Sequence, residues 1–178
     1  MKQDYKDKMS TGNAEVLERD VMKRIGLLIR PVRVSDYGKI RDFLLETKSL
    51  YPGIGYWWDN RVCSSMASGK RIVYVVDVDG CIEGLFIGKR GVSAKICTLR
   101  LRKSIRGQGV GSDLLSVGIS HLIDPNTNQL YVTVSGAAED GSRHFFESEG
   151  FKLKAVEPNR YNKGVEEFVY VREVERIE

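Results

Sequence analysis

The sequence predicts a single α/β domain, in which a mixed, mostly antiparallel twisted sheet is flanked by helices. β-Rich runs at 72–78 and 82–88 flank Asp79-Gly80, a dipeptide typical of tight hairpins. A third run at 94–102 would extend this antiparallel part of the sheet. It leads through a glycine-rich turn and a helical pattern into a strand at 130–134, and a helical crossover of this kind joins parallel strands. The length of 178 residues suits one domain with a sizeable core.

The N-terminal half of this domain is predicted to form a strand followed by two helices. The strand covers 27–32, and Ser35-Asp36 would cap the first helix. One face of that helix carries Tyr37, Ile40, Leu44 and Thr47. A turn-rich break at 51–55 precedes the second helix, which we expect over 57–68.

The last two strands are expected at 151–156 and 165–171, joined through residues 158–162. The first 26 residues are polar and mixed in charge, with only a weak helical periodicity. We therefore assign 1–26 to an N-terminal extension and 27–178 to the domain.

Composition excludes several classes of protein. Hydrophobic residues make up 42% and charged residues 29%, which is ordinary for a globular chain, and no apolar run reaches the length of a membrane span. The N-terminus lacks the apolar stretch of a secretory signal, so a cytoplasmic location is expected. Cys63, Cys81 and Cys97 lack paired spacing, so we expect small buried residues rather than a disulfide framework or a zinc site, and no metal.

The most informative segment is Arg106-Gly107-Gln108-Gly109-Val110-Gly111-Ser112, which opens the helical pattern. The first N–H groups of a helix lack partners and carry partial positive charge, so this end suits a pyrophosphate. Glycines let the backbone approach a phosphate and permit positive φ, and Arg106 can add a charge-assisted hydrogen bond. Position 112 lacks the glycine of a dinucleotide fingerprint, and no Lys follows Gly111 as in a Walker loop. The turn therefore predicts a nucleotide-like cofactor of another kind.

The pattern R-x-x-G-x-G after a strand resembles the acyl-CoA-binding motif of the GNAT acetyltransferase superfamily. Three further segments lie in the order that the family would place them: Leu99-Arg100-Leu101, Thr133-Val134-Ser135 and the run from Phe145 to Phe151. The resemblance implies a GNAT-like fold that uses acetyl-CoA as co-substrate. Residues 106–112 would hold its phosphates, and the backbone of Leu99, Arg100 and Leu101 would contact its pantetheine arm.

The chemistry implied by the resemblance is attack of an amine on the acetyl thioester. The family commonly uses a tyrosine to protonate the departing sulfur, but this chain has Phe146 at that position, and Lys95 stands where some members have a glutamate base. Substitute acids are sought among hydroxyl groups near the cleft, with Tyr161 ahead of Ser135 and Ser142 because a phenol is the most suitable acid. The candidate bases, acting through water, are Glu139, Asp140 and Glu147.

The acceptor would lie opposite the co-substrate, where the densest aromatic cluster of the chain is found at 51–58. Trp57 and Trp58 are the candidate acceptor contacts. Because adjacent helical residues face different directions, one would be buried while the other lines the cleft. Seven basic residues and no acidic one lie between Lys89 and Arg106, which suits CoA phosphates, a solvated strand edge or an RNA partner.

We conclude that an N-acetyltransferase acting on the primary amine of a small molecule or protein is expected. One alternative is a GNAT-type enzyme that acts on aminoacyl-tRNA or another nucleic acid. Another is a CoA-binding regulatory module without catalysis. No membrane partner is expected, and pairing of an edge strand or of the N-terminal extension would allow a homodimer.

Overall fold

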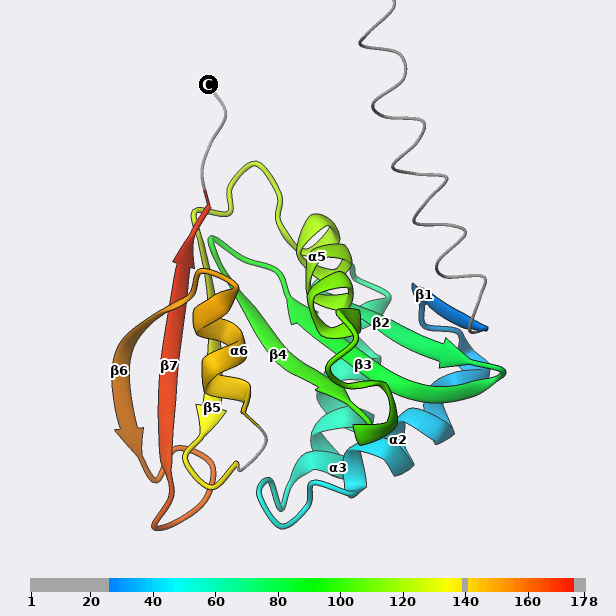
Figure 1. Cartoon of the computed structure of the whole chain (residues 1–178), viewed down its shortest axis with the longest axis horizontal. Coiled ribbons are helices and arrows are strands. Elements are labelled where there is room, and N and C mark those ends of the chain that lie inside the picture. Colours follow the sequence, from blue (N-terminus) through cyan, green and yellow to red (C-terminus); the bar gives the residue numbers. More distant parts are fainter. Residues whose placement is uncertain (1–25, 139–140, 175–178) are drawn as a thin grey trace, which may run out of the picture.

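In the computed structural model, which describes residues 26–138 and 141–174, seven strands form one sheet in the order β1-β2-β3-β4-β5-β7-β6 (Figure 1). The strands are β1 (Leu27–Pro31), β2 (Arg71–Val78), β3 (Cys81–Lys89), β4 (Ser93–Leu101), β5 (Gln129–Ser135), β6 (Lys152–Pro158) and β7 (Glu166–Glu173). Only β4 and β5 pair in parallel, while the other neighbouring strands are antiparallel. The predicted mixed, mostly antiparallel sheet in one domain is therefore confirmed.

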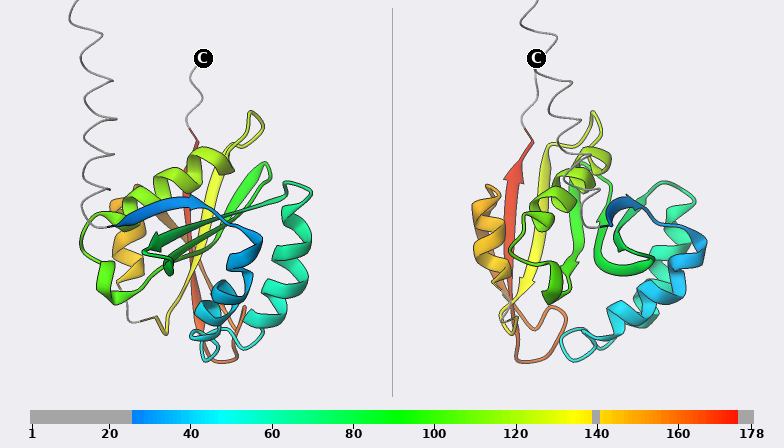
Figure 2. Two further views of the ribbon diagram at one scale, coloured as in Figure 1. Left: turned by 90° about the vertical axis from the view of Figure 1, so that its right-hand side faces the viewer. Right: turned by 45° about the vertical axis from the view of Figure 1, so that its right-hand side comes forward.

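Helices cover both faces of this sheet (Figure 2). The α-helices are α2 (Tyr37–Leu45), α3 (Ile54–Trp57), α4 (Cys63–Met66), α5 (Val110–Leu122) and α6 (Ser142–Ser148). On one face, α5 and α6 pack against the sheet through residues such as Leu114 and Phe146. On the other face, Ile40, Phe43 and Trp58 bring α2 and the segment after α3 onto the sheet. The core is thus divided into two layers, one on each face.

The hairpin between β2 and β3 forms where the sequence predicts it. Asp79 and Gly80 have φ of 50° and 84°, and this left-handed conformation at both turn residues matches the right-handed twist of the two strands. The carboxylate of Asp77 accepts a hydrogen bond from the Gly80 N–H at 2.7 Å, which fixes the turn.

The first helix departs from prediction at both ends. Asp36 is the N-cap residue, but its side chain makes no cap hydrogen bond with the helix. Its carboxylate instead binds the guanidinium of Arg30 and accepts the N–H of Arg33. At the other end the helix stops at Leu45, and the Thr47 hydroxyl donates back to the carbonyl of Leu44, so Thr47 is not part of the helical face.

The second helical segment begins at Ile54, three residues before the predicted start at 57. It runs through α3, a five-residue π-helical turn η2 (Trp58–Val62) and α4 to Met66. Gly53 occupies the N-cap position, so the turn-rich break ends earlier than predicted. This segment places the two tryptophans on the face of the sheet that α2 also covers.

Two features open a gap in the middle of the sheet. Thr98 of β4 lies opposite Ile87 of β3, but Ile96 lies opposite Gly88, which leaves Cys97 as an extra, bulged residue. The ladder between β4 and β5 covers only 93–96 and 129–132, so the strands diverge beyond it, as Figure 1 shows. The gap lies at the carboxyl ends of two parallel strands, where α/β sheets commonly bind ligands.

The remaining predictions have mixed outcomes. The weak helical pattern and nearly all of the predicted N-terminal extension lie outside the described residues. The prediction that the cysteines are buried is wrong, because Cys81 is exposed in the hairpin and Cys63 and Cys97 are partly exposed. No helix in the described part of the chain is long and apolar enough to cross a membrane.

Candidate functional site

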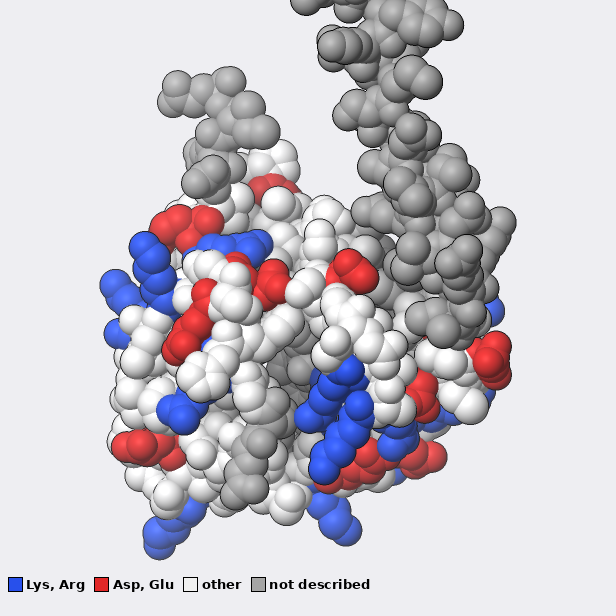
Figure 3. All heavy atoms as spheres, in the orientation of Figure 1, with Lys and Arg blue, Asp and Glu red and all other residues white. Residues whose placement is uncertain are grey.

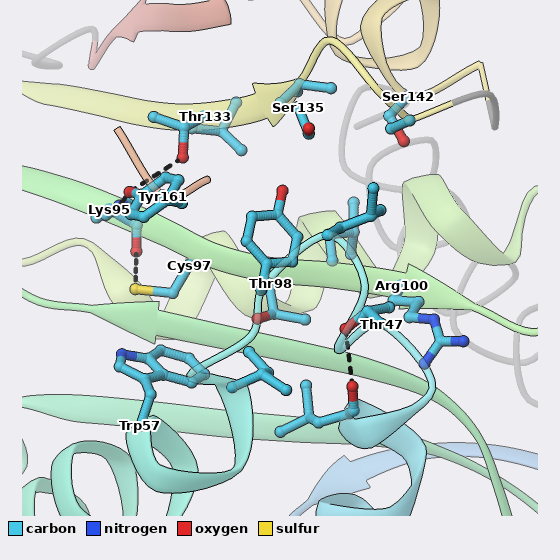
Figure 4. A pocket seen from close by; sticks show the side chains of 18 of the residues that line it. Thr47, Trp57, Lys95, Cys97, Thr98, Arg100, Thr133, Ser135, Ser142 and Tyr161 are labelled. Carbon is cyan, nitrogen blue, oxygen red and sulfur yellow. Dashed lines mark hydrogen bonds between the residues drawn. The ribbon is translucent and has the colours of Figure 1, made fainter. Parts of the chain in front are cut away.

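A cavity of about 590 Å³ fills the gap between β4 and β5 (Figure 4). Its walls come from the two diverging strands, the connection between α2 and α3, the start of α6, and the connection between β6 and β7. Thr98 and Leu99 line it from β4, and Thr133 and Ser135 line it from β5. The cavity is of the size that small-molecule sites usually have.

The glycine turn lies between β4 and α5, at one end of the gap. Gly107 and Gly109 have φ of 72° and 82°, values that a residue with a side chain rarely adopts. Nothing lies within 4 Å of where a Cβ would stand at either position, so the backbone of the turn is open to a ligand. Gly109 is the N-cap residue of α5, whose first N–H groups are those that suit an anion.

The other residues of the turn offer the ligand little besides backbone. The Val110 side chain is buried in the core, and the Ser112 hydroxyl donates to the carboxylate of Glu149 at 2.5 Å. At Gly111 a Cβ would lie 3.3 Å from the Phe145 ring, so glycine here serves the packing of α5 on α6. Only the backbone of these three residues is available to a phosphate.

Two polar side chains of the turn are exposed or partly exposed. Gln108 is exposed, and its amide donates to the Ser104 carbonyl at 3.1 Å. Arg106 uses its Nε to donate to the Leu101 carbonyl at 2.9 Å. Lys and Arg side chains gather over this connection from β4 to α5 (Figure 3), which suits an anionic ligand.

The predicted pantetheine-contacting segment is divided between the two faces of β4. Leu99 and Leu101 pack toward the core under α5, whereas Arg100 points to the opposite face. There Arg100 forms an ion pair with Glu46 at 2.7 Å, donates to the Phe43 carbonyl and lies over the Phe43 ring. Leu99 and Arg100 line the cavity, and the Leu101 side chain does not.

Tyr161 lines the cavity from the connection between β6 and β7. Its hydroxyl accepts a hydrogen bond from Lys95 Nζ at 2.6 Å and lies 3.4 Å from Thr133 Oγ1 (Figure 4). Burial by itself would raise the pKa of Tyr161, but the hydrogen bonds from Lys95 and Thr133 and the charges of Lys95 and Arg160 lower it below its usual value. The phenol is therefore a stronger proton donor than an ordinary tyrosine.

Of the other hydroxyl candidates, Ser135 and Ser142 both line the cavity, and Ser135 is buried. Phe146 lines it too, and its ring packs edge-on against Phe145 and Phe151. None of the candidate bases is placed in the cavity by the described residues. Glu147 accepts a hydrogen bond from Tyr170 at 2.9 Å and does not line the cavity, while Glu139 and Asp140 lie outside the described residues.

Sequence reasoning missed Glu167, a buried carboxyl group at the side of the cavity. Glu167 of β7 lies directly opposite Ser135 of β5, so the two side chains share one face of the sheet. Only 1% of Glu167 is exposed, and its Oε2 has no hydrogen-bond partner within the part of the chain described. Burial raises the pKa of Glu167, although a hydrogen bond with Ser135 and the charges of Arg160 and Lys95 oppose this shift. Glu167 alternates with the apolar residues Val165 and Val169, so the pattern of the strand could have predicted that its side chain faces the core.

The two tryptophans separate as adjacent helical residues should. Trp57 lines the cavity and lies under the guanidinium of Arg71, 5.4 Å from its ring centre. Trp58 is 1% exposed and packs edge-on against Tyr37 in the core. Trp58 is therefore removed from the candidate acceptor contacts, because no part of its ring is free to meet a ligand.

The model of the acetyltransferase (GNAT) domain family matches residues 58–173. The chain belongs to the GNAT acetyltransferases. Membership of this family implies acyltransferase activity. A comparison with curated protein sequences finds no match.

Solved GNAT structures share the fold over most of this chain. A putative GNAT acetyltransferase from Desulfovibrio desulfuricans superposes with a TM-score of 0.69 at 18% identity, over 83% of this chain and 98% of that chain. Ard1 from Thermoplasma volcanium gives 0.67 at 21% identity, over 85% and 100%. PaiA N-acetyltransferase from Thermoplasma acidophilum, solved in complex with coenzyme A, gives 0.65 at 16% identity, over 83% and 99%. These similarities show the GNAT fold.

The residues present fit coenzyme A. The turn at 106–112 presents open backbone at a helix N-terminus, and it follows the end of β4, the strand that forms one side of the gap. Within residues 26–138 and 141–174, no cluster of three or more His, Cys, Asp or Glu side chains could hold a metal ion.

Proposed function

We propose that this chain is an N-acetyltransferase that moves the acetyl group of acetyl-CoA to a primary amine. The observation that carries the proposal is the gap between β4 and β5: hydroxyl groups and Lys95 line the cavity in this gap, and the open glycine turn follows the end of β4. Coenzyme A in the structures of PaiA and of an aminoglycoside 6'-N-acetyltransferase supports the choice of co-substrate.

In the proposed reaction, acetyl-CoA supplies an acetyl thioester, whose C–S bond breaks as the C–N bond to the amine forms. The amine loses one proton and the thiolate gains one. The backbone of residues 106–112 would bind the phosphates, and the backbone of Leu99, Arg100 and Leu101 would orient the pantetheine arm and offer an N–H to the developing oxyanion.

Tyr161 is the proposed acid. Lys95 Nζ holds its hydroxyl at 2.6 Å and favours the phenolate left after the proton departs. At the position where some family members have a glutamate base, this chain thus has Lys95, which would activate the acid Tyr161. Phe146 has no proton to donate, and its ring packs against Phe145 and Phe151, so the proposed proton donor comes from the β6–β7 connection instead of from α6.

Glu167, with Ser135, is the proposed acceptor of the proton that the amine loses. Its raised pKa brings the carboxylate closer to the neutral range where a general base is effective. The unpartnered Oε2 leaves one side of the carboxylate available, and Ser135 connects it to the cavity.

The test begins with calorimetric titration of the protein with acetyl-CoA, followed by mass spectrometry for free CoA with and without a panel of amines. Saturable binding and amine-dependent release of CoA would support the proposal. Binding without release across the panel would favour the non-catalytic CoA-binding module or an acceptor such as aminoacyl-tRNA. Absence of binding would overturn the proposal.

A variant of the turn sharpens the binding step. Gln108→Glu places a carboxylate beside the expected phosphates with no change in size, and should weaken CoA binding by about tenfold. Gln108→Met is the matched neutral control and should bind nearly as well as the wild-type chain. Equal affinity in the two variants would remove the turn from the site.

A further inference from the structure

Three basic residues form a row across neighbouring strands on one face of the sheet. Arg71 of β2 lies directly opposite Lys89 of β3, and Lys89 lies directly opposite Lys95 of β4. All three line the cavity, on the face that α3 and α4 cover. We call these residues the cationic row.

Like charges directly opposite each other on a sheet are destabilising, so the row costs the fold stability unless an anion compensates it. Other basic residues of the cavity have carboxylate partners, namely Glu46 for Arg100 and Glu157 for Arg160. Among the described residues, no ion pair includes a member of the row. No acidic side chain of the described part of the chain lines the cavity either.

Aromatic rings and a thiol contact the two outer members of the row, Arg71 and Lys95, instead. Arg71 lies over Trp57 and donates to Cys97 Sγ at 3.2 Å. Lys95 Nζ lies 5.6 Å from the centre of the Tyr131 ring and 5.3 Å from that of Tyr161. Rings restrict where a cation can lie but do not neutralise its charge. Arg71 and Lys95 are therefore held in place by these contacts, Lys89 between them is exposed, and no member of the row has an ion-pair partner among the described residues.

The row also lies away from the expected phosphate site. Lys95 stands near the beginning of β4, whereas the glycine turn follows the end of the strand. An anion bound by the row would therefore reach the cavity from the side opposite the glycine turn, which is the side left for the acceptor.

We propose that the acceptor is a small amine that carries an anionic group, a carboxylate or a phosphate, and that the cationic row binds this group. The inference rests on the proposed acetyl transfer and names the class of its acceptor. Polycationic amines are disfavoured, since a second ammonium would meet the row. A cavity of about 590 Å³ favours a small acceptor over a nucleic acid.

The first experiment compares amines that differ only at the far end. β-Alanine and γ-aminobutyrate are titrated into the CoA-saturated protein beside their amides and the diamines of equal length, and O-phosphoethanolamine forms a separate phosphate arm. We expect the anionic amines to bind at least about tenfold more tightly than the amides, and the diamines to bind most weakly. The two anionic arms distinguish a carboxylate from a phosphate.

Variants of Lys89 test whether the row causes the preference. Lys89→Gln should remove most of the difference between the acid and its amide, Lys89→Arg should keep it, and Lys89→Glu should shift the preference toward the diamine. Lys70→Gln is the matched control, because Lys70 is exposed, precedes Arg71 and does not line the cavity. The control should bind every probe like the wild-type chain.

A second readout needs no ligand. Since Lys89→Gln removes one of three opposed cations, its thermal midpoint without ligand should rise, whereas Lys70→Gln should leave it unchanged. Tighter binding or faster acetylation of diamines than of anionic amines, or no binding of any anionic amine, would overturn the inference. CoA release with diamines alone would leave the proposed acetyl transfer intact, whereas failure to bind acetyl-CoA would remove that function itself.

Discussion

Two clusters of charged side chains in this protein follow opposite rules. At the β1–β2 edge, the buried Arg30 guanidinium binds Asp36 at 2.7 Å and Asp77 at 2.8 Å. Hydrogen bonds with Arg30 hold the pKa of Asp36 below its ordinary value, and they outweigh burial to lower that of Asp77. Around the cavity, by contrast, the cationic row has no ion-pair partner in the described chain, and Glu167, which lies opposite the cavity-lining Ser135, has one carboxylate oxygen without a hydrogen-bond partner there.

The difference teaches how to separate structural charges from functional ones. The charges and hydrogen bonds of the Arg30 cluster are satisfied within the fold, so this cluster needs no ligand. It fixes β1 against β2. A cluster that is left unbalanced is retained at a cost in stability, which is typical of sites where a ligand completes the balance. Substitutions in the two clusters should therefore act on different measurements.

The largest effect is expected from Arg30→Met. This substitution leaves two carboxylates in a buried site without their cation, and should lower the free energy of unfolding by about 3–5 kcal/mol. Urea unfolding followed by circular dichroism measures the loss. A loss below about 1 kcal/mol would mean that the cluster is no better balanced than a surface ion pair.

Tyr161→Phe should affect the reaction rather than the fold. Removing the proposed acid should lower kcat by about a hundredfold, with little change in CoA affinity. Tyr131→Phe, in the same cavity, is the control and should keep the wild-type rate. If the two variants have equal rates, Tyr161 is not the acid.

Glu167→Gln should change how stability depends on pH. The pKa of Glu167 is raised in the folded chain, so the stability it contributes is complete below its ordinary value of 4.5 and is lost as the pH rises through the folded value. The pKa values of Asp36 and Asp77 are lowered, so their contribution is present above the ordinary value of 3.8 and is lost as the pH falls through the folded values.

Denaturant titrations at a series of pH values separate these opposite trends. The variant should lose the decline of stability with rising pH and keep the acid-side loss that comes from the Arg30 cluster. Its kcat should also fall, by about tenfold or more, if the carboxylate accepts the proton of the amine. An unchanged pH profile of stability would contradict the buried position of Glu167.

The smallest effect is expected where an ion pair is exposed. Arg41 and Asp59 lie 2.9 Å apart, but 45% and 41% of their side chains are exposed. Water and salt screen this pair, so Arg41→Gln should change the free energy of unfolding by about 0.5 kcal/mol or less. Urea unfolding of Arg41→Gln and Arg30→Met under the same conditions compares the two losses of stability. A loss in Arg41→Gln as large as that in Arg30→Met would contradict the difference drawn here between exposed and buried pairs.

Features that depend on local backbone chemistry could be predicted from the sequence. Asp79-Gly80 forms the predicted hairpin, and Gly107 and Gly109 adopt the positive φ that their turn requires, because neighbouring residues alone decide these conformations. The separation of Trp57 from Trp58 likewise follows from helical geometry.

Features that depend on contacts between distant parts of the chain could not be predicted from the sequence. The bulge at Cys97 arises from the register of β3 against β4, which no local pattern encodes. Glu167 is buried because β7 pairs with β5 and places it opposite Ser135. Asp36 was expected to cap a helix, but Arg30 on a neighbouring strand competes for its carboxylate more strongly than a backbone N–H does.

The short ladder between β4 and β5 also has a consequence for synthesis on the ribosome. Strands β1 to β4 pair in sequence order, so that half can assemble as the chain emerges. β5 pairs with β4 only over 93–96, and its other edge pairs with β7. The ribosome adds β7 some thirty residues after β5. Until β7 is made, β5 has one unpaired strand edge in the nascent chain, so the second side of the gap is the last part of the site to be completed.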